Sequence, residues 1–122
     1  MHTMYVTVGR DIAGEPMSDR QWDLARMALR SGVLKCLVSV DEETTVEVHT
    51  GEGRWNDGVN GEGVAEESSI ISFRRDSAWT EDEITNVRQY LHLSAVLLEQ
   101  EAIALATGES HLIFSSVEAA GI

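Results

Sequence analysis

The spacing of hydrophobic and polar residues divides the chain into seven predicted elements, of which three lie in its first third. Strand-forming residues over 4–12 predict a strand, in which Gly9 indicates a bulge or a close backbone approach. Helical apolar spacing over 19–30 predicts a helix that ends at Gly32. The nearly unbroken apolar run over 33–40 then predicts a buried central strand.

The next strand is predicted over 45–50, where apolar and polar residues alternate. This alternation points Val46 and Val48 inward and Glu47 and His49 to the opposite side. The pattern is typical of an outer strand with one buried face.

The rest of the chain contains a glycine-rich loop and three further elements. The predicted loop covers 51–67 and holds five of the ten glycines, around Trp55. After it we predict a strand over 68–75, a helix of about 25 residues from Thr80 to Gly108, and a last strand over 111–117.

Both predicted helices begin with the same two devices, a capping box and a hydrophobic staple. The boxes are Ser18 with Gln21 and Thr80 with Glu83, and the staples are Met17 with Trp22 and Trp79 with Ile84.

The resulting order, β-α-β-β-β-α-β, predicts a single α+β domain over residues 1–122. We expect a largely antiparallel sheet with two helices on one face, as a variant of the ferredoxin-like fold. The apolar stripe of the second helix is broader than one sheet requires, so we also expect a homo-oligomer.

Composition narrows the class of protein. The chain has 122 residues, 43% of them hydrophobic, and a net charge of -12, which disfavours direct nucleic-acid binding. No apolar stretch approaches the roughly 20 residues of a membrane span, so no membrane association is expected. The single cysteine, Cys36, excludes an internal disulfide and sits in an apolar run, where we expect a raised pKa. These features predict a cytoplasmic protein.

The charge is concentrated in the middle of the chain. Residues 41–83 hold thirteen acidic and three basic residues, so this segment carries -10 of the net -12. A surface of one sign attracts cations or basic protein patches.

No motif predicts a catalytic centre, a cofactor or a metal. Asn56, Asn60, Gly61 and Glu67 match four positions of a calcium loop, but the remaining ligands and the flanking helices are missing. The glycines lack the spacing of phosphate-binding loops, and the four histidines lack ligand spacing. We therefore assign no catalytic residues and expect no cofactor.

The candidate binding residues lie in and beside the glycine-rich loop. Trp55 is either an anchor on the core or an exposed platform, and Arg74 is suited to an anionic ligand. Glu66 and Glu67 are adjacent, so in a strand they face opposite sides, and one of them is suited to bonding backbone groups. The complete set is Trp55, Asp57, Glu62, Glu66, Glu67 and Arg74.

Several short segments resemble small uncharacterised α/β proteins encoded by phages of actinobacteria. They are Val6 to Arg10, Glu15-Pro16-Met17 with Trp22, Gly53-Arg54-Trp55, Glu66-Glu67-Ser68, and Gln100 to Leu105. The resemblance implies a phage or mobile-element origin, and hence the cytoplasm of a bacterial host cell, but no established reaction.

The interpretation that follows is a non-enzymatic accessory protein that binds a host or defence protein through segment 41–83, in anti-defence or host takeover. One alternative is an oligomer that sequesters a nucleotide, with Trp55 stacking on the base and Arg74 or Arg75 binding phosphate. Another is a small enzyme whose site joins Glu47, His49 and Glu66 or Glu67 at the base of the loop.

Overall fold

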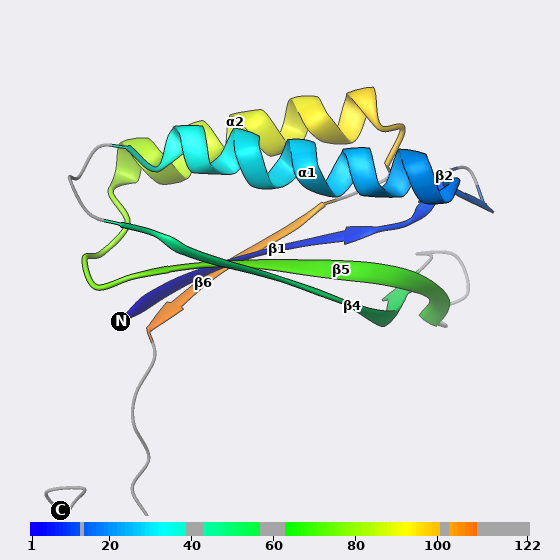
Figure 1. Ribbon diagram of the computed structural model, residues 1–122, viewed down its shortest axis with the longest axis horizontal. Coiled ribbons are helices and arrows are strands. Elements are labelled where there is room, and N and C mark those ends of the chain that lie inside the picture. The colour runs from blue at the N-terminus through cyan, green and yellow to red at the C-terminus, as the bar shows by residue number, and fades with distance from the viewer. Residues whose placement is uncertain (13, 39–42, 57–62, 101–102, 110–122) are drawn as a thin grey trace, which may run out of the picture.

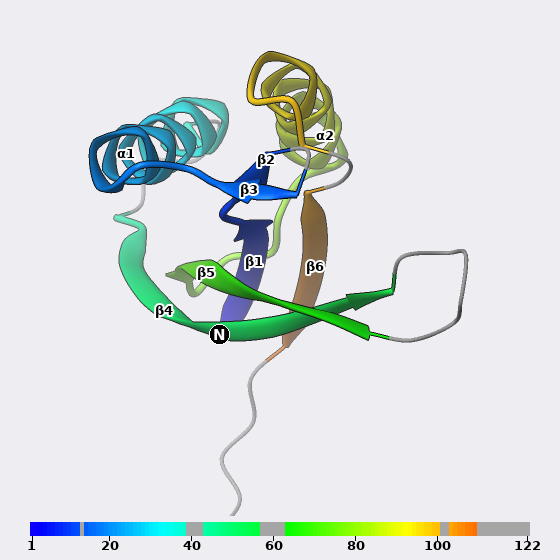
Figure 2. The ribbon, with the colours of Figure 1, turned by 90° about the vertical axis from the view of Figure 1, so that its right-hand side faces the viewer.

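Two helices cover one face of a four-stranded antiparallel sheet, and no described residue covers the other face (Figure 1). In an end-on view the helices lie side by side above the sheet (Figure 2). The computed structural model describes residues 1–12, 14–38, 43–56, 63–100 and 103–109, with backbone alone for 53–56, 63–65 and 109. In these residues neither helix is long and apolar enough to span a membrane.

The sheet has the strand order β4-β5-β1-β6, and every neighbouring pair is antiparallel. This order confirms the predicted α+β, ferredoxin-like class. The main strands are β1 (His2–Gly9), β4 (Thr45–Asn56), β5 (Gly63–Arg75) and β6 (Ala104–Glu109), and the helices are α1 (Asp19–Cys36) and α2 (Glu81–Leu97). A small hairpin of β2 (Asp11–Ile12) and β3 (Glu15–Pro16) joins β1 to α1, turning at Gly14 with a φ of 84°.

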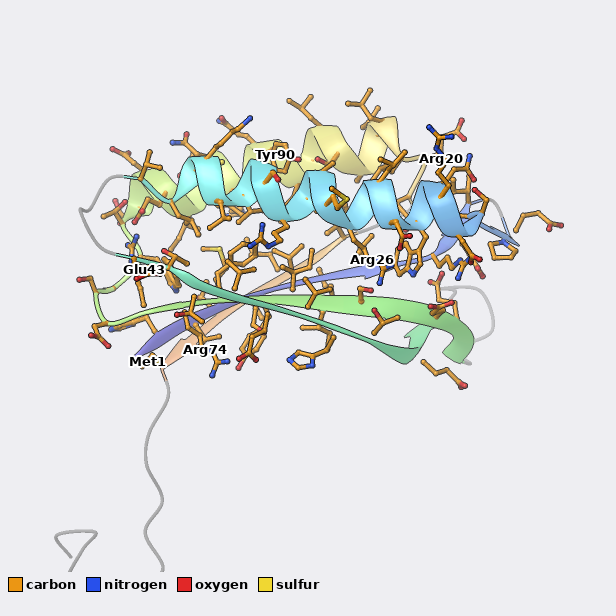
Figure 3. All side chains as sticks on the ribbon, viewed as in Figure 1. Met1, Arg20, Arg26, Glu43, Arg74 and Tyr90 are labelled. Carbon is orange, nitrogen blue, oxygen red and sulfur yellow. The ribbon has the colours of Figure 1, made fainter. Side chains whose placement is uncertain are left out.

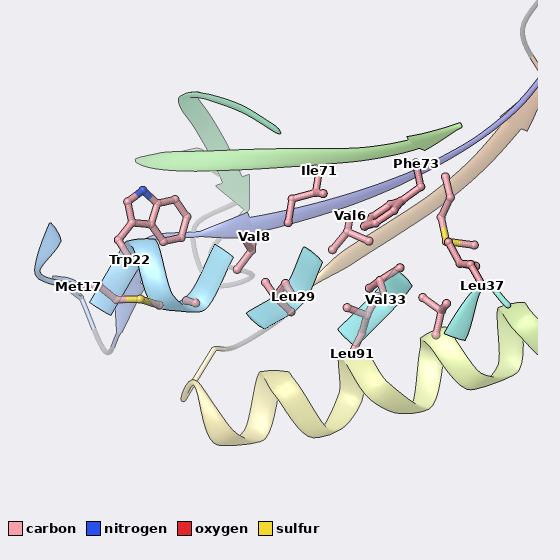
Figure 4. Close-up of a cluster of buried hydrophobic side chains, with 13 residues drawn as sticks. Val6, Val8, Met17, Trp22, Leu29, Val33, Leu37, Ile71, Phe73 and Leu91 are labelled. Carbon is pink, nitrogen blue, oxygen red and sulfur yellow. The ribbon is translucent and has the colours of Figure 1, made fainter. Parts of the chain in front are cut away.

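The core lies between the sheet and the two helices (Figure 4). Strand alternation brings every second residue of β1 and β5 to this side, where each packs against an apolar stripe of a helix. The fully or nearly fully buried members include Met4, Val6, Val8, Ile71 and Phe73 from the strands and Trp22, Leu29, Val33, Val87 and Leu91 from the helices.

The predicted central strand over 33–40 is wrong, because α1 continues to Cys36. Leu29, Val33 and Leu37 are all buried, and their spacing of four continues the apolar stripe of the helix. Gly32 therefore does not end α1. Instead it lies inside the helix, where a Cβ atom would stand 2.0 Å from Cζ of Tyr90 on α2.

The second helix ends about ten residues before the predicted position. Glu99 adopts a left-handed φ of 52°, and the backbone N–H groups of Glu99 and Gln100 donate to the carbonyls of Val96 and Ala95. This is the Schellman arrangement, formed with a glutamate where glycine is usual. The side chain of Gln100 also donates to the carbonyl of Asp11, 2.9 Å away, and so joins the helix end to β2.

Two further boundaries differ from the predicted ones. β4 and β5 extend far into the predicted loop over 51–67, pairing as far as Asn56 with Gly63. Residues 104–108, expected in the helix, lie in β6. The strand predicted over 111–117 lies outside the described residues.

Candidate functional site

The structure describes half of the predicted binding residues completely. Glu66, Glu67 and Arg74 lie in β5. Trp55 lies in β4 with its backbone paired to Val64, and its side chain is outside the description. Asp57 and Glu62 lie outside the described residues.

Glu66 is held against the end of β1, on the open side of the sheet. Its Oε2 accepts a hydrogen bond of 2.8 Å from the backbone N–H of Asp11. Gly9 leaves the space for this contact, since a Cβ atom there would lie 2.4 Å from Oε1 of Glu66. The close backbone approach predicted at Gly9 is therefore confirmed, and its partner is a carboxylate.

Glu67 points to the opposite side of β5 and binds Arg10. The Arg10 guanidinium donates to Glu67 Oε2, to Asp19 Oδ1 and to the carbonyl of Met17, each at 2.7 Å. The hydrogen bonds to Asp19 and Glu67 raise the pKa of Arg10 above its usual value. Arg10 thus joins β5 to the start of α1 and fixes the orientation of the Glu67 carboxylate.

A hollow of about 310 Å³ at the base of the β4–β5 hairpin is lined by Gly51, Glu52, Glu66 and Glu67, with the side chains of Glu66 and Glu67 on opposite faces of β5. Glu52 lies directly opposite Glu67 in the strand register. We call this hollow the acidic hollow. Its lining contains carboxylates and glycine backbone, so it favours a cationic ligand.

The described residues contain no group of three or more His, Cys, Asp or Glu side chains arranged to hold a metal ion. The carboxylates of the acidic hollow are partly committed, Glu66 to a backbone N–H and Glu67 to Arg10. Their arrangement is therefore better suited to an organic cation than to a bare ion that needs several converging oxygens.

Glu47 and His49 do not join Glu66 and Glu67, as the small-enzyme alternative expected. They lie in a second hollow of about 310 Å³ on the open face of the sheet, lined by Thr3, Tyr5, Glu47, His49, Ile70, Ser72 and Arg74. His49 pairs with Ile70, which is four residues along β5 from Glu66, or roughly 13 Å at the rise of a strand. The predicted single group is therefore two separate groups.

Sequence reasoning missed Arg10 and Asp11, which position the two glutamates. Arg10 was one of the residues in the phage-like segments, but nothing in its neighbourhood connected it to position 67. The only local signal was Gly9, a glycine at the end of a strand, which marked a close approach without naming the partner.

Comparison with known proteins finds similarity in structure only. No family model matches the chain, and no curated protein matches it. A phage S-adenosylmethionine (SAM) lyase solved with S-methyl-5'-thioadenosine superposes with a TM-score of 0.58 at 16% identity, covering 88% of this chain and 80% of that one. The phage SAM lyase in its apo state gives a TM-score of 0.53 at 15% identity, covering 88% and 78%.

These matches correct the interpretation drawn from the sequence. The preferred class, a non-enzymatic protein that binds through segment 41–83, is contradicted, since the solved structures that share this fold include a phage enzyme. The geometry supplies a physical reason for the error. Several acids of that segment are bound within the molecule: Glu47 to Arg74, Glu66 to the Asp11 amide, Glu67 to Arg10 and Glu83 to Arg75.

Proposed function

We propose that this protein is a phage-encoded enzyme that binds SAM and releases S-methyl-5'-thioadenosine, with its substrate held at the acidic hollow. The observation that carries the proposal is the carboxylate lining of that hollow, at the base of the β4–β5 hairpin, in a fold similar to that of a phage SAM lyase. Glu66 is the residue to which we assign direct contact with the substrate.

The charge of the substrate matches the charge of the hollow. SAM carries a permanently positive sulfonium centre, which carboxylates attract in a partly shielded site. Release of S-methyl-5'-thioadenosine breaks the bond between sulfur and the methionyl Cγ. Sulfur keeps the bonding pair and becomes a neutral thioether, while an oxygen of the substrate's own α-carboxylate bonds to Cγ, so that the rest of the substrate leaves as homoserine lactone. The hollow therefore attracts substrate more strongly than product, which assists product release.

The geometry gives the two glutamates different parts. Glu66 has one oxygen bound to the Asp11 amide and is kept in place by the bare backbone of Gly9. Glu67 is held by Arg10, which partly neutralises it. We assign Glu66 direct contact with the sulfonium and Glu67, whose side chain lies on the opposite face of β5, only the longer-range attraction of its charge.

Removal of SAM from a host cell deprives its methyltransferases of their methyl donor. A phage enzyme of this kind would act in the bacterial cytoplasm, where that donor is made. The phage origin implied by the sequence resemblance is therefore retained, but the function is catalysis and not the binding of a host protein.

The test is incubation of the purified protein with SAM, with S-methyl-5'-thioadenosine measured by liquid chromatography and mass spectrometry. We expect product from the wild type, and in Glu66→Gln a KM raised roughly 10-fold or more, because a charged contact to the substrate is lost. Glu43→Gln is the matched control, since it removes one exposed carboxylate just before β4 and should leave KM unchanged.

Two results would contradict the proposal. One is the absence of S-methyl-5'-thioadenosine at any substrate concentration, and the other is an equal KM in the wild type, Glu66→Gln and Glu67→Gln. Binding of SAM without turnover would favour the alternative of a protein that sequesters a nucleotide.

A further inference from the structure

The second hollow brings an arginine, a glutamate and a histidine together on the open face of the sheet. Glu47 Oε1 lies 2.7 Å from Nη2 of Arg74, and Glu47 Oε2 lies 3.3 Å from Nε2 of His49. The register explains this grouping, since Glu47 is opposite Ser72, beside the pairs formed by Thr45 with Arg74 and His49 with Ile70. Figure 3 shows Arg74 on the side of the sheet away from the helices.

The other lining residues form an amphipathic surround. Tyr5 and Ile70 are each 42% exposed, which is unusual for large side chains in the middle of a sheet. They provide an apolar surface beside the charged groups. Ser72 and Thr3 are almost fully buried beneath them and form a polar floor.

From this geometry we propose that the second hollow binds an α-amino acid group, meaning a carboxylate and an ammonium on one carbon. The Arg74 guanidinium is suited to a carboxylate through paired hydrogen bonds. The Glu47 carboxylate is suited to the ammonium, and Tyr5 and Ile70 to an apolar side chain. The carboxylate and the ammonium of one α-carbon can thus bind two residues of opposite charge that already lie side by side.

The Arg74–Glu47 pair is open enough to exchange partners. The Arg74 side chain is 34% exposed and that of Glu47 is 46% exposed, and ion pairs exposed to this degree contribute little net stability. A zwitterionic ligand offers each of the two residues a new partner of the same charge as the old one. Opening the pair therefore costs little, and neither charge is left unpaired.

This site is separate from the acidic hollow, so the inference goes beyond the proposed function and does not depend on it. Two sources share the ligand chemistry. One is a free amino acid, and the other is the amino-acid end of a larger molecule such as SAM. The experiment below separates them.

The first measurement is an NMR titration of the wild type with L-methionine, which needs no variant. We expect shifts confined to the resonances of Tyr5, His49 and Arg74 and their neighbours. Two analogues provide the matched comparison: 3-(methylthio)propylamine lacks the carboxylate, and 4-(methylthio)butanoate lacks the ammonium. Each should bind at least roughly 10-fold more weakly, because each leaves one charge of the hollow without its partner.

Variants of the two charged residues then test whether Arg74 and Glu47 are each needed to bind the ligand. Arg74→Gln and Glu47→Gln should each lose L-methionine binding, and Arg20→Gln, on the exposed surface of α1, should keep it. Thermal unfolding of each variant checks that it remains folded. S-adenosylhomocysteine, which carries the same group without the sulfonium, is titrated in parallel.

The outcomes show whether the second hollow binds an amino-acid group and which kind of molecule supplies that group. Shifts by L-methionine alone support a free amino acid, and shifts by S-adenosylhomocysteine at the same residues support the end of an adenosyl ligand. The proposal is overturned if neither compound shifts these residues, or if either analogue binds as tightly as L-methionine. Production of S-methyl-5'-thioadenosine is measured separately, so a failure here leaves the proposed reaction standing.

Discussion

Arg74 and Arg75 are neighbours in β5, yet they lie on opposite faces of the sheet in opposite environments. The Arg75 side chain is 0% exposed and the carboxylate that it binds, on Glu83, is 1% exposed. Arg75 donates to both oxygens of Glu83 and to the carbonyls of Ser77 and Ala78. Its guanidinium also stacks 4.3 Å from the ring centre of Trp79. Arg74 has a partly exposed partner and an open hollow in front of it.

The difference shows that one residue type serves two purposes according to the parity of its position in the strand. A charge sealed beneath α2 is tolerated because its donors are satisfied by fixed acceptors. The same group on the uncovered face retains donors that a ligand can reach. Of these two arginines, the one on the covered face therefore has a structural role, and the one on the open face is available for binding.

The largest expected effect is on stability, and it separates the two arginines. Arg75→Met leaves the buried Glu83 carboxylate without its main partner, so we expect a loss of about 3–5 kcal/mol in the free energy of unfolding, measured with urea. Arg74→Met is the matched control and should change it by no more than about 1 kcal/mol. Similar losses in the two variants would contradict the distinction between the two faces.

The helix layer should tolerate an added methyl group poorly at Gly32. Gly32→Ala forces its Cβ into the Tyr90 ring and disturbs the 2.7 Å hydrogen bond from Tyr90 Oη to the Ala28 carbonyl. We expect a destabilisation of about 1–3 kcal/mol, even though alanine is the better helix former. Gly108→Ala, which meets no atom within 4 Å, is the control. Thermal unfolding measures both, and a stabilised Gly32→Ala variant would contradict the close packing.

The same change on the other face should affect activity more than stability. Gly9→Ala meets the carboxylate of Glu66, which is the flexible end of a side chain and can rotate away. We expect an unfolding free energy within about 1 kcal/mol of the wild type. SAM conversion should fall roughly 10- to 100-fold, because Glu66 leaves its position. Unchanged conversion in Gly9→Ala would show that the orientation of Glu66 is unimportant.

The smallest effect concerns the thiol in the last turn of α1. Burial raises the pKa of Cys36, and its Sγ donates a weak hydrogen bond to the Gly32 carbonyl. At a given pH less thiolate is present than in a free cysteine, so alkylation by iodoacetamide should be slower and should accelerate only at higher pH. A rate at pH 8 equal to that of the urea-unfolded chain would contradict this prediction.

Much of the fold could be predicted from local patterns. Both capping boxes form as expected, with Ser18 and Gln21 and with Thr80 and Glu83 bonding reciprocally. The raised pKa of Cys36 is also confirmed, although the residue lies in a helix and not in a strand. The capping boxes depend on residues close together in the sequence, where spacing alone determines the geometry.

The failures arose where a tertiary contact overrode local preference. An apolar run over 33–40 fits a buried strand and the end of a buried helix equally well, and packing against the sheet decided for the helix. The end of α2 depends on a glutamate in the left-handed region, held in part by the contact of Gln100 with Asp11. The predicted residues Glu66 and Glu67 lie at one end of β5, but Arg10 and Asp11 could not be connected to them without the pairing of β1 with β5.

The contact between Arg10 and Glu67 spans 57 positions of the chain, and that separation affects how the site forms during folding. The acidic hollow takes its geometry from β1, the start of α1 and the β4–β5 hairpin together. Contacts of such long range form late, after a large loss of chain entropy. A chain interrupted before position 67, or a peptide of the hairpin alone, therefore lacks the assembled site, and binding appears only with the complete sheet.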